Sequence, residues 1–289
     1  TYMKIGVPKE IKSQENRIGL TPESVKILTS NGNEVMVENN GGFEAGFYNE
    51  QYKSAGAKIV DKAEDIFNDS EIIVKVKEPQ SSEVKMIKEN QIVFTYLHLA
   101  AAKELTKGLV DSKSVCIAYE TVTDNNGRLP LLAPMSAVAG RMSVQAGAHC
   151  LEKNQKGRGL LLGGAPGVDP GNVVILGGGV VGENAAIIAT GMKAKVHIVD
   201  KSEQRLNELS KKFGDLIIPK LSDETDLEKL ISECDLLVGG VLIPGAEAPK
   251  LVTKKMLKNM KRGSVIVDVA IDQGGCVETS KPTTFAEPT

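Results

Sequence analysis

The sequence Val-Val-Ile-Leu-Gly-Gly-Gly-Val-Val-Gly at residues 173–182 decides the fold of this 289-residue chain. A short apolar run, Val173–Leu176, leads directly into a turn of glycines, and a stretch with helical character, Glu183–Met192, follows. This order of strand, glycine turn and helix is typical of the phosphate-binding site of dinucleotide-binding α/β domains. The sequence therefore predicts an α/β fold with a dinucleotide site at this turn.

Each glycine of the turn has an expected task in binding a pyrophosphate. Gly177 permits the tight bend, Gly179 lets the backbone approach the phosphates, and Gly182 lets helix and strand pack closely. Val180 belongs to the same turn, where the helix N-terminus supplies N–H groups. The next strand ends at Asp200, whose carboxylate would accept a hydrogen bond from a ribose 2′-hydroxyl and would repel a 2′-phosphate. The predicted cofactor is therefore NAD rather than NADP.

Two alternatives accompany this interpretation of the turn. Lys201 and Arg205 lie close to Asp200 in the sequence, and their charges weaken the preference for NAD if they face the ribose. A tight glycine turn can also serve the fold alone and bind no ligand.

Outward from this turn, both halves of the chain alternate short apolar runs with helical stretches. Such alternation indicates parallel, doubly wound sheets, so the predicted fold class is α/β with two Rossmann-like domains joined by a long helix. The predicted strands are Lys4–Val7, Glu34–Glu38, Glu71–Val76, Gln91–Tyr96 and Val115–Tyr119, followed by Val173–Leu176, Lys195–Val199, Leu216–Ile218, Asp235–Val238 and Ser264–Val269.

The boundary between the two domains is predicted near residue 130. The sequence Asp-Asn-Asn-Gly at residues 124–127 is a strong turn signal, and two prolines follow within residues 129–135. A long amphipathic stretch, residues 136–151, then predicts the connecting helix. We therefore expect a substrate-binding and catalytic domain over residues 1–130 and an NAD-binding domain over residues 131–289.

Composition excludes several classes of protein. The 35 basic residues balance 37 acidic ones without any like-charge block, so the basic footprint of a nucleic-acid-binding protein is absent. No apolar run approaches the roughly 20 residues of a membrane helix, and we expect a cytoplasmic protein. The four cysteines lie far apart without a C-x-x-C pair, so we expect neither a disulfide framework nor a metal site.

Reactive side chains follow several predicted strands, at the carboxyl ends where ligands bind to open α/β sheets. Arg17 can hold a carboxylate with its bidentate fork and Lys77 can donate to an adjacent carbonyl, a pair that recognises a 2-oxo acid. The imidazole of His98 can exchange the proton that accompanies hydride transfer, because histidine is a common general acid and base. Asp272, from the second domain, can orient water or ammonia at the same carbon.

Taken singly, these residues have simpler explanations. Arg17 and Lys77 can be solvated surface charges, and His98 lies in an apolar stretch where a structural imidazole is the ordinary interpretation. Two further acidic residues, Glu78 and Glu120, also follow predicted strands, and we expect them to position the loops. The functional interpretation therefore rests on the convergence of several groups.

With these residues in view, the sequence resembles the alanine dehydrogenase family from Met3 to Thr289. The resemblance implies reversible oxidative deamination of L-alanine to pyruvate and ammonium with NAD, in a homo-oligomer that is typically a hexamer. The blocks that carry it are IGVPKE (5–10), VKVKEP (74–79), TYLHLA (95–100), LLAPMS (131–136) and VDVAIDQGG (267–275).

The resemblance also implies roles for individual residues. Arg17 and Lys77 fall on substrate-binding positions, and His98 and Asp272 fall on catalytic acid/base positions. Besides the glycine turn, the cofactor-contact positions are Ser136, Asp200, Arg205, Ser222, Val241, Leu242 and Val269. Which of His98 and Asp272 activates water stays open, as does the range of substrate side chains.

Two alternative functions remain beside this one. Family members normally continue beyond the position of Thr289, so a chain of this length is expected to be less stable, and a catalytically impaired NAD-binding module is one alternative. The other is the NAD-binding subunit of proton-translocating transhydrogenase, which shares the fold and the Lys-Val-Lys strand. That subunit passes hydride to a second nucleotide and needs no substrate histidine, so the stretch around His98 favours the dehydrogenase.

Overall fold

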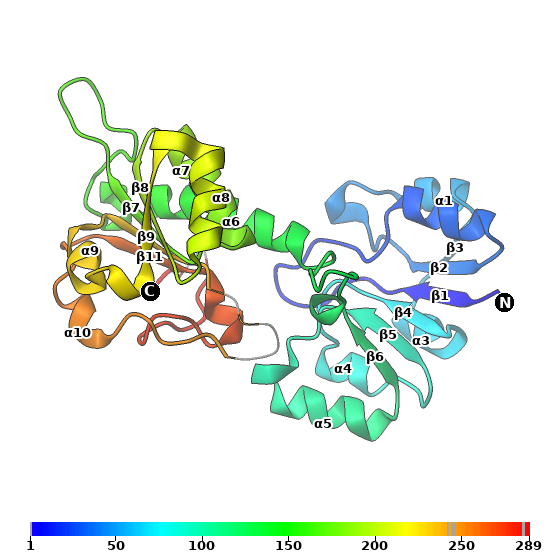
Figure 1. Cartoon of the computed structure of the whole chain (residues 1–289). Helices are drawn as coiled ribbons and strands as arrows, with labels where there is room; N and C mark the ends of the chain where they lie inside the picture. Colours follow the sequence, from blue (N-terminus) through cyan, green and yellow to red (C-terminus); the bar gives the residue numbers. More distant parts are fainter. Residues whose placement is uncertain (1, 242, 244–246, 285–286) are drawn as a thin grey trace. The chain divides into compact units, whose positions relative to one another are not determined.

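The computed structural model describes the chain except for residues 1, 242, 244–246 and 285–286. It divides into two compact units, Thr1–Leu131 and Leu132–Thr289 (Figure 1). Each unit is built on one parallel sheet, with six strands in the first and five in the second. The predicted fold class, α/β with two doubly wound parallel sheets, is confirmed.

The first unit winds outward from its first strand in both directions. Its elements are β1 (Lys4–Val7), α1 (Pro22–Ser30), β2 (Glu34–Glu38), α2 (Asn49–Ser54), β3 (Lys58–Val60), α3 (Ala63–Asp69), β4 (Ile72–Val74), α4 (Ser81–Val84), β5 (Ile92–Thr95), α5 (Lys103–Ser112) and β6 (Val115–Ala118). The strand order is β3-β2-β1-β4-β5-β6. The chain leaves β1 toward β2 and β3 and later returns to β4 on the other side, so the order reverses between β1 and β4.

Alternating strand residues fill a core on each face of this sheet. Val35 and Val37 of β2 pack in one cluster with Tyr52 of α2. Met36, which lies between them in β2, packs in a second cluster with Phe67 of α3. Because successive side chains of a strand point to opposite faces, helices must cover both sides of the sheet, as doubly wound folds require.

One strand of the first sheet is not predicted by the sequence. β3 is only three residues long and lies at the edge of the sheet, beside β2. So short a segment does not stand out as an apolar run, because only Ile59 and Val60 are hydrophobic and Lys58 is exposed.

The second unit repeats this winding with different strands. Its elements are α6 (Ala133–Cys150), β7 (Asn172–Leu176), α7 (Val180–Gly191), β8 (Lys195–Asp200), α8 (Glu203–Phe213), β9 (Ile217–Leu221), α9 (Leu227–Glu233), β10 (Leu236–Gly239), α10 (Lys254–Leu257) and β11 (Val265–Asp268). The strand order is β11-β10-β7-β8-β9. The order reverses between β7 and β10, beside the glycine turn that follows β7.

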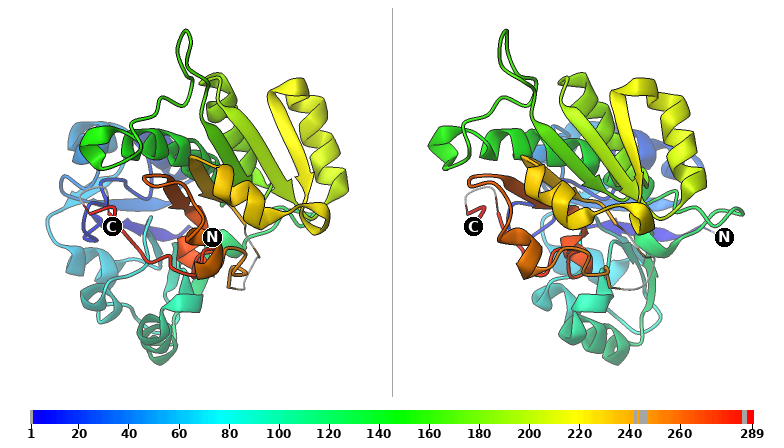
Figure 2. Two further views of the ribbon diagram at one scale, coloured as in Figure 1. Left: turned by 90° about the vertical axis from the view of Figure 1, so that its left-hand side faces the viewer. Right: turned by 60° about the vertical axis from the view of Figure 1, so that its left-hand side comes forward.

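Helices lie on both faces of the second sheet (Figure 2), and buried side chains form a core on each face. Val173 and Ile175 of β7 pack with side chains of α6, α7 and α8. Val174 and Leu176 of the same strand pack on the other side with Ile231 of α9. The apolar run in the sequence is therefore continuous because this central strand is buried on both faces.

The predicted connecting helix appears as α6, which starts three residues before the expected position. Pro134 occupies its first turn, where a proline costs no intrahelical hydrogen bond. The helix packs along α7, and a Cβ on Gly140 would lie 2.2 Å from the Val181 carbonyl oxygen. Glycine at this position is therefore what lets the two helices approach so closely.

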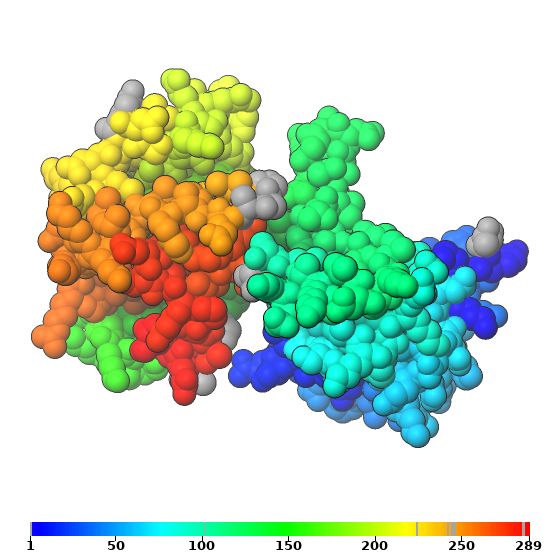
Figure 3. Space-filling view, turned by 90° about the horizontal axis from the view of Figure 1, so that it is seen from below, coloured from blue at the N-terminus to red at the C-terminus, as the bar shows by residue number. Residues whose placement is uncertain are grey.

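The last described residues of the chain lie on the surface of the second unit. A bridge joins Val252 to Val277, and the N–H of Glu278 donates to the Val252 carbonyl at 2.8 Å. In the space-filling view this C-terminal segment (red) lies against the segment around α10 (orange) (Figure 3). Within the described part of the chain, no helix is long and apolar enough to cross a membrane, and no group of His, Cys, Asp and Glu could hold a metal ion.

Candidate functional site

Three of the predicted site residues follow three neighbouring strands of the first sheet. Arg17 lies in the loop after β1, Lys77 follows β4, and His98 follows β5. Because β1, β4 and β5 are adjacent and parallel, their carboxyl ends bring these residues to one edge of the sheet. That edge includes the reversal between β1 and β4, where open α/β sheets bind ligands. The fourth residue, Asp272, lies in the second unit.

A buried ion network lies beneath this edge. The side chain of Lys75 is completely buried, and its ammonium contacts the Glu10 carboxylate at 2.9 Å and the Glu83 carboxylate at 2.8 Å. The exposed fractions of Glu10 and Glu83 are only 7% and 2%. Since a buried charge is very costly without partners, these three side chains must hold one another in a single arrangement.

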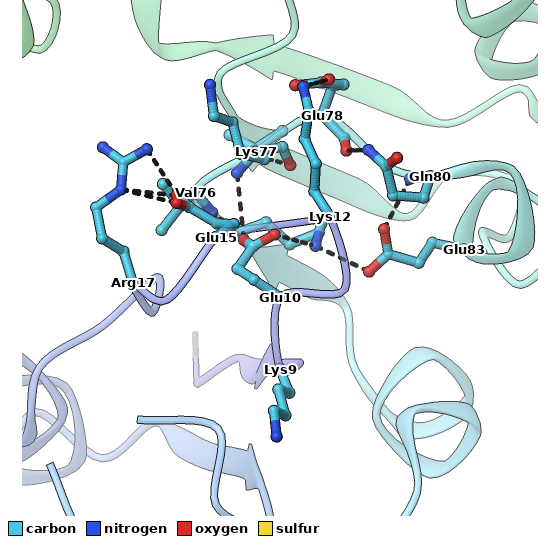
Figure 4. A network of polar contacts seen from close by, with 12 residues as sticks. Lys9, Glu10, Lys12, Glu15, Arg17, Val76, Lys77, Glu78, Gln80 and Glu83 are labelled. Atoms are coloured by element: carbon cyan, nitrogen blue, oxygen red, sulfur yellow. Dashed lines mark hydrogen bonds and ion pairs between the residues drawn. The ribbon is translucent and has the colours of Figure 1, made fainter. Parts of the chain in front are cut away.

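The Glu10 carboxylate also holds the turn that carries Lys77. Its second oxygen accepts from the backbone N–H of Val76 at 2.5 Å and from that of Lys77 at 3.2 Å (Figure 4). Glu83 caps the same segment further along, since its other oxygen accepts from the Gln80 N–H at 2.7 Å. The backbone from Val76 to Gln80 is therefore fixed at both ends by buried carboxylates.

The loop after β1 is joined to this turn by further charges. Lys12 forms an ion pair with Glu78. Burial would raise the pKa of Glu78, but the contact with Lys12 and the charge of Lys77 lower this pKa below its ordinary value. Arg17 donates through Nε to Glu15 at 2.7 Å. In Figure 4 the side chains of Arg17 and Lys77 extend in the same general direction from the network. The prediction that Glu78 positions the loops agrees with its pairing to Lys12.

The turn after β5 holds His98 in an unusual backbone conformation. Its φ of 50° and ψ of 44° lie in the left-handed region, which is uncommon for residues other than glycine. The carboxylate of Glu120 accepts from the backbone N–H of His98 at 2.6 Å and from that of Leu97 at 3.0 Å. These hydrogen bonds stabilise the turn, in agreement with the expected positioning role of Glu120.

The aromatic ring of Tyr96 lies beside the imidazole of His98. The two rings are stacked, with 6.0 Å between the centroids and 13° between the planes. The Tyr96 hydroxyl donates to the Leu131 carbonyl at 2.5 Å. Burial raises the pKa of Tyr96 above its ordinary value despite the opposing charge of Arg17, so this hydroxyl keeps its proton at neutral pH.

The glycine turn of the second unit has the geometry that a phosphate-binding turn requires. Gly177 has a φ of +94°, which a side chain would strain. A Cβ on Gly182 would lie 1.8 Å from the Gly177 carbonyl oxygen, so only glycine allows the helix to approach the strand. A Cβ on Gly179 would meet no atom within 4 Å, and the 12-residue helix α7 begins directly after it. This open space at a helix N-terminus fits a pyrophosphate.

Asp200 and Arg205 hold the turn from the neighbouring strand. One Asp200 oxygen accepts from the Gly178 N–H at 2.6 Å, and the other accepts from the Ser202 N–H at 2.8 Å. Arg205 donates through Nε to the Gly178 carbonyl at 2.7 Å and also pairs with Glu183 and Glu208. The Arg205 guanidinium is therefore engaged by the turn and by two carboxylates, which leaves it less able to weaken a preference for NAD.

The remaining predicted cofactor residues follow the other strands of the second sheet. Ser222 comes after β9, Val241 after β10, and Val269 after β11, while Ser136 lies in the first turn of α6. Since all five strands are parallel, the loops after them leave the sheet at a common edge. Leu242 lies outside the described residues.

Asp272 is presented by a short 3₁₀ helix, Val269–Gln273, directly after β11. The strand ends at Asp268, whose carboxylate accepts from the Val277 N–H at 3.0 Å and from the Ser280 hydroxyl at 2.6 Å. Asp268 thus ties the segment after this helix back to the end of the strand, while the side chain of Asp272 itself is exposed.

Sequence reasoning missed the supporting residues of both units. It assigned no role to Glu10, Lys75, Glu83 or Asp268, although all four make several polar contacts. A signal was present for Lys75, since it interrupts the apolar strand Ile-Ile-Val-Lys-Val at residues 72–76. A lysine at a buried strand position requires a carboxylate partner, but periodicity alone does not say which one.

Two family models together match almost the whole chain. The N-terminal domain of "Alanine dehydrogenase/PNT" matches residues 6–139, and the C-terminal domain of the same family matches residues 143–289. The two matches meet within α6, the helix that begins just after the junction between the two units of the structure.

Individual proteins and solved structures give the same result. An alanine dehydrogenase of Halomonas elongata is 55% identical over 99% of this chain and 77% of its own length, and one of Methanococcus maripaludis is 53% identical with the same coverage. An L-alanine dehydrogenase structure superposes with a TM-score of 0.92 at 52% identity, covering 99% of this chain and 79% of that one. A transhydrogenase structure from Sinorhizobium meliloti has a TM-score of 0.79 at 26% identity, covering 96% and 81%. This chain belongs to the alanine dehydrogenase/PNT family.

Proposed function

We propose that this protein catalyses the reversible, NAD-dependent oxidative deamination of L-alanine to pyruvate and ammonium. The observation that carries the proposal is the presence of Arg17, Lys77 and His98 after three adjacent strands, beside the reversal of strand order. Relatives named alanine dehydrogenase, at 50–55% identity over nearly the whole chain, support it.

Arg17 and Lys77 are the proposed substrate-binding residues. The planar guanidinium of Arg17 can bind the substrate carboxylate through two parallel hydrogen bonds. The ammonium of Lys77 can donate to the 2-oxo oxygen of pyruvate as a compact charge. Together these cations recognise the two adjacent oxygen-bearing groups of a 2-oxo acid.

His98 and Asp272 are the proposed catalytic residues. In the oxidative direction, the Cα of L-alanine loses a hydride and the nitrogen loses a proton, which leaves an imino acid. Water adds to that carbon and loses a proton, and the resulting carbinolamine releases ammonium to give pyruvate. Either the His98 imidazole or the Asp272 carboxylate can assist the addition of water by accepting its proton, and the imidazole can exchange the proton as the departing nitrogen is protonated.

NAD is the proposed cofactor, and when bound it would accept the hydride. Gly177, Gly179, Val180 and Gly182 would surround its pyrophosphate, and the Asp200 carboxylate retains lone pairs for the adenosine ribose beside its two backbone hydrogen bonds. The further proposed contacts are Ser136, Arg205, Ser222, Val241, Leu242 and Val269.

We also propose a homo-oligomer, a hexamer as the family resemblance implies, working in the cytoplasm. A cytoplasmic enzyme would meet NAD, pyruvate and ammonium together.

All four cysteines are free thiols, and burial raises the pKa of Cys234 and Cys276 to about 12, so both stay protonated and unreactive.

The test is the oxidation of NADH by the purified chain in the presence of pyruvate and ammonium, followed by absorbance. The controls are a reaction without ammonium, a reaction with NADPH, and the variant His98→Ala. We expect turnover that requires ammonium, prefers NADH and is lost in the variant. Bound NADH without turnover would instead indicate a binding module, and hydride transfer to a second nucleotide would indicate a transhydrogenase-type subunit.

A further inference from the structure

We propose that Glu10 is a positioning residue that sets the place of Lys77 relative to Arg17, and that the ammonium of Lys75 holds Glu10 in that role. This inference rests on the proposed function, because it concerns how the 2-oxo acid is held. Glu10 itself need not touch the substrate, since its oxygens are already taken by Lys75 and by two backbone N–H groups.

Glu10 is the only carboxylate among the described contacts that links the loop carrying Arg17 to the backbone of Lys77. It comes from the segment after β1, seven residues before Arg17 in the sequence, and it reaches the N–H of Val76 and of Lys77. The segment is anchored on its other side as well, because the Lys9 N–H donates to Glu38 at 2.8 Å. A shift of Glu10 would therefore change the spacing between the two proposed substrate cations.

Stability alone does not account for this network. Three buried charges are costly to desolvate, and apolar side chains of similar volume often stabilise a core equally well. What an ion network adds is a defined geometry, because Lys75 must satisfy both carboxylates at 2.9 and 2.8 Å at once. A fixed geometry is what a site needs to hold two oxygen-bearing groups of one small substrate.

Glu83 provides a matched control for Glu10. Both carboxylates are buried, both pair with the ammonium of Lys75, and both accept from a backbone N–H group. They differ in that Glu10 holds the N–H of Lys77, whereas Glu83 holds that of Gln80. A general loss of the ion network should therefore affect both variants equally, and a positioning role should appear only at Glu10.

The experiment compares Glu10→Gln with Glu83→Gln in the full chain. Each substitution replaces one of the two acceptor oxygens by an amide donor, which must face either the Lys75 ammonium or the backbone N–H, so both should lower the unfolding midpoint by similar amounts. We expect Glu10→Gln to raise the KM for pyruvate about tenfold, roughly the loss of one charge-assisted hydrogen bond. For Glu83→Gln we expect less than about a twofold change, and the Kd for NADH should stay unchanged in both variants.

Two results would overturn the proposal: an unchanged KM for pyruvate in Glu10→Gln, or equal increases in both variants. If Glu10→Gln does not fold, Glu10→Asp serves instead, because it keeps the charge for Lys75 but withdraws the oxygens from the Lys77 backbone. The same rise in KM is expected of it, and an unchanged KM contradicts the proposal.

A wild-type protein without turnover would overturn the proposed function, but the positioning role of Glu10 could still be tested. Amide hydrogen exchange at Val76 and Lys77 then decides the positioning role. We expect faster exchange there in Glu10→Gln than in Glu83→Gln, and equal rates in the two variants would refute the inference.

Discussion

The two units share one winding pattern but hold their functional turns by different means. In each sheet the strand order reverses beside the first strand, between β1 and β4 in one unit and between β7 and β10 in the other. At the first reversal the turns are held by buried charged side chains, namely Glu10, Lys75 and Glu83. At the second the turn depends on glycines, because Gly177 has a φ of +94° that would strain a side chain and Gly182 leaves no room for a Cβ.

The difference follows from the kind of group, side chain or backbone N–H, that the edge of each sheet offers to a ligand. The first unit offers side chains, and a long side chain such as that of Lys77 is placed accurately only if its backbone is held. The second unit offers backbone N–H groups to a phosphate, and close approach requires the absence of side chains. One fold therefore uses buried charges where it positions side chains and glycines where it exposes backbone, while the partly exposed Asp200 and Arg205 support the glycine turn.

The largest expected effect comes from Lys75→Met, which removes the shared cation of the first unit. It leaves Glu10 and Glu83 buried without their partner, so we expect a loss of about 3–5 kcal/mol of unfolding free energy. Denaturant unfolding measures it, and Lys77→Met is the control, since that side chain is only partly buried. A Lys75→Met protein as stable as Lys77→Met would show that the charges are dispensable.

The next effect, in the second unit, comes from two alanine substitutions in one turn. Gly182→Ala should cost about 1–3 kcal/mol and weaken NADH binding, because its Cβ would lie 1.8 Å from the Gly177 oxygen. Gly179→Ala should leave stability nearly unchanged and still weaken NADH binding, because its methyl would enter the open space at the N-terminus of α7. Thermal unfolding and NADH titration distinguish the two, and normal NADH binding by Gly179→Ala would contradict the placement of the pyrophosphate.

A smaller effect is expected at the turn that carries His98. Glu120→Gln keeps one acceptor oxygen for the N–H groups of Leu97 and His98 but loses the charge, a cost of about 1 kcal/mol. We expect kcat to fall by about fivefold, the equivalent of that energy, with little change in the KM for pyruvate. If the KM rose instead, Glu120 would support substrate binding and resemble Glu10.

The smallest effect is a dependence of stability on pH in the second unit. Burial, together with the charges of Lys195 and Lys220, lowers the pKa of His197 in β8 below its ordinary value of 6.5. Below that pH the unfolded chain binds a proton that the folded chain resists, so His197 destabilises the fold in acid. We expect His197→Val to raise the free energy of unfolding more below pH 6.5 than above it. An equal change at both pH values would show that His197 titrates normally.

Local signals in the sequence account for most of the secondary structure that was predicted. The runs Lys4–Val7 and Glu34–Glu38 are strands with the predicted bounds, and the others agree to within a few residues. The three-residue strand β3 escaped prediction because it is too short to carry a period. Helix α7 begins earlier than expected, at Val180, because the chain turns into the helix immediately after Gly179.

By itself, the sequence determined the α/β class, the glycine turn and the side chains that follow each strand, because these depend on residues close together in the chain. Only the tertiary structure decided which strands are neighbours, and therefore that Arg17, Lys77 and His98 share one edge. It also decided that Glu10 pairs with Lys75, which is 65 residues away. The physical reason is that strand order and buried ion pairs are set by packing between distant segments, which leaves no local periodicity in the sequence.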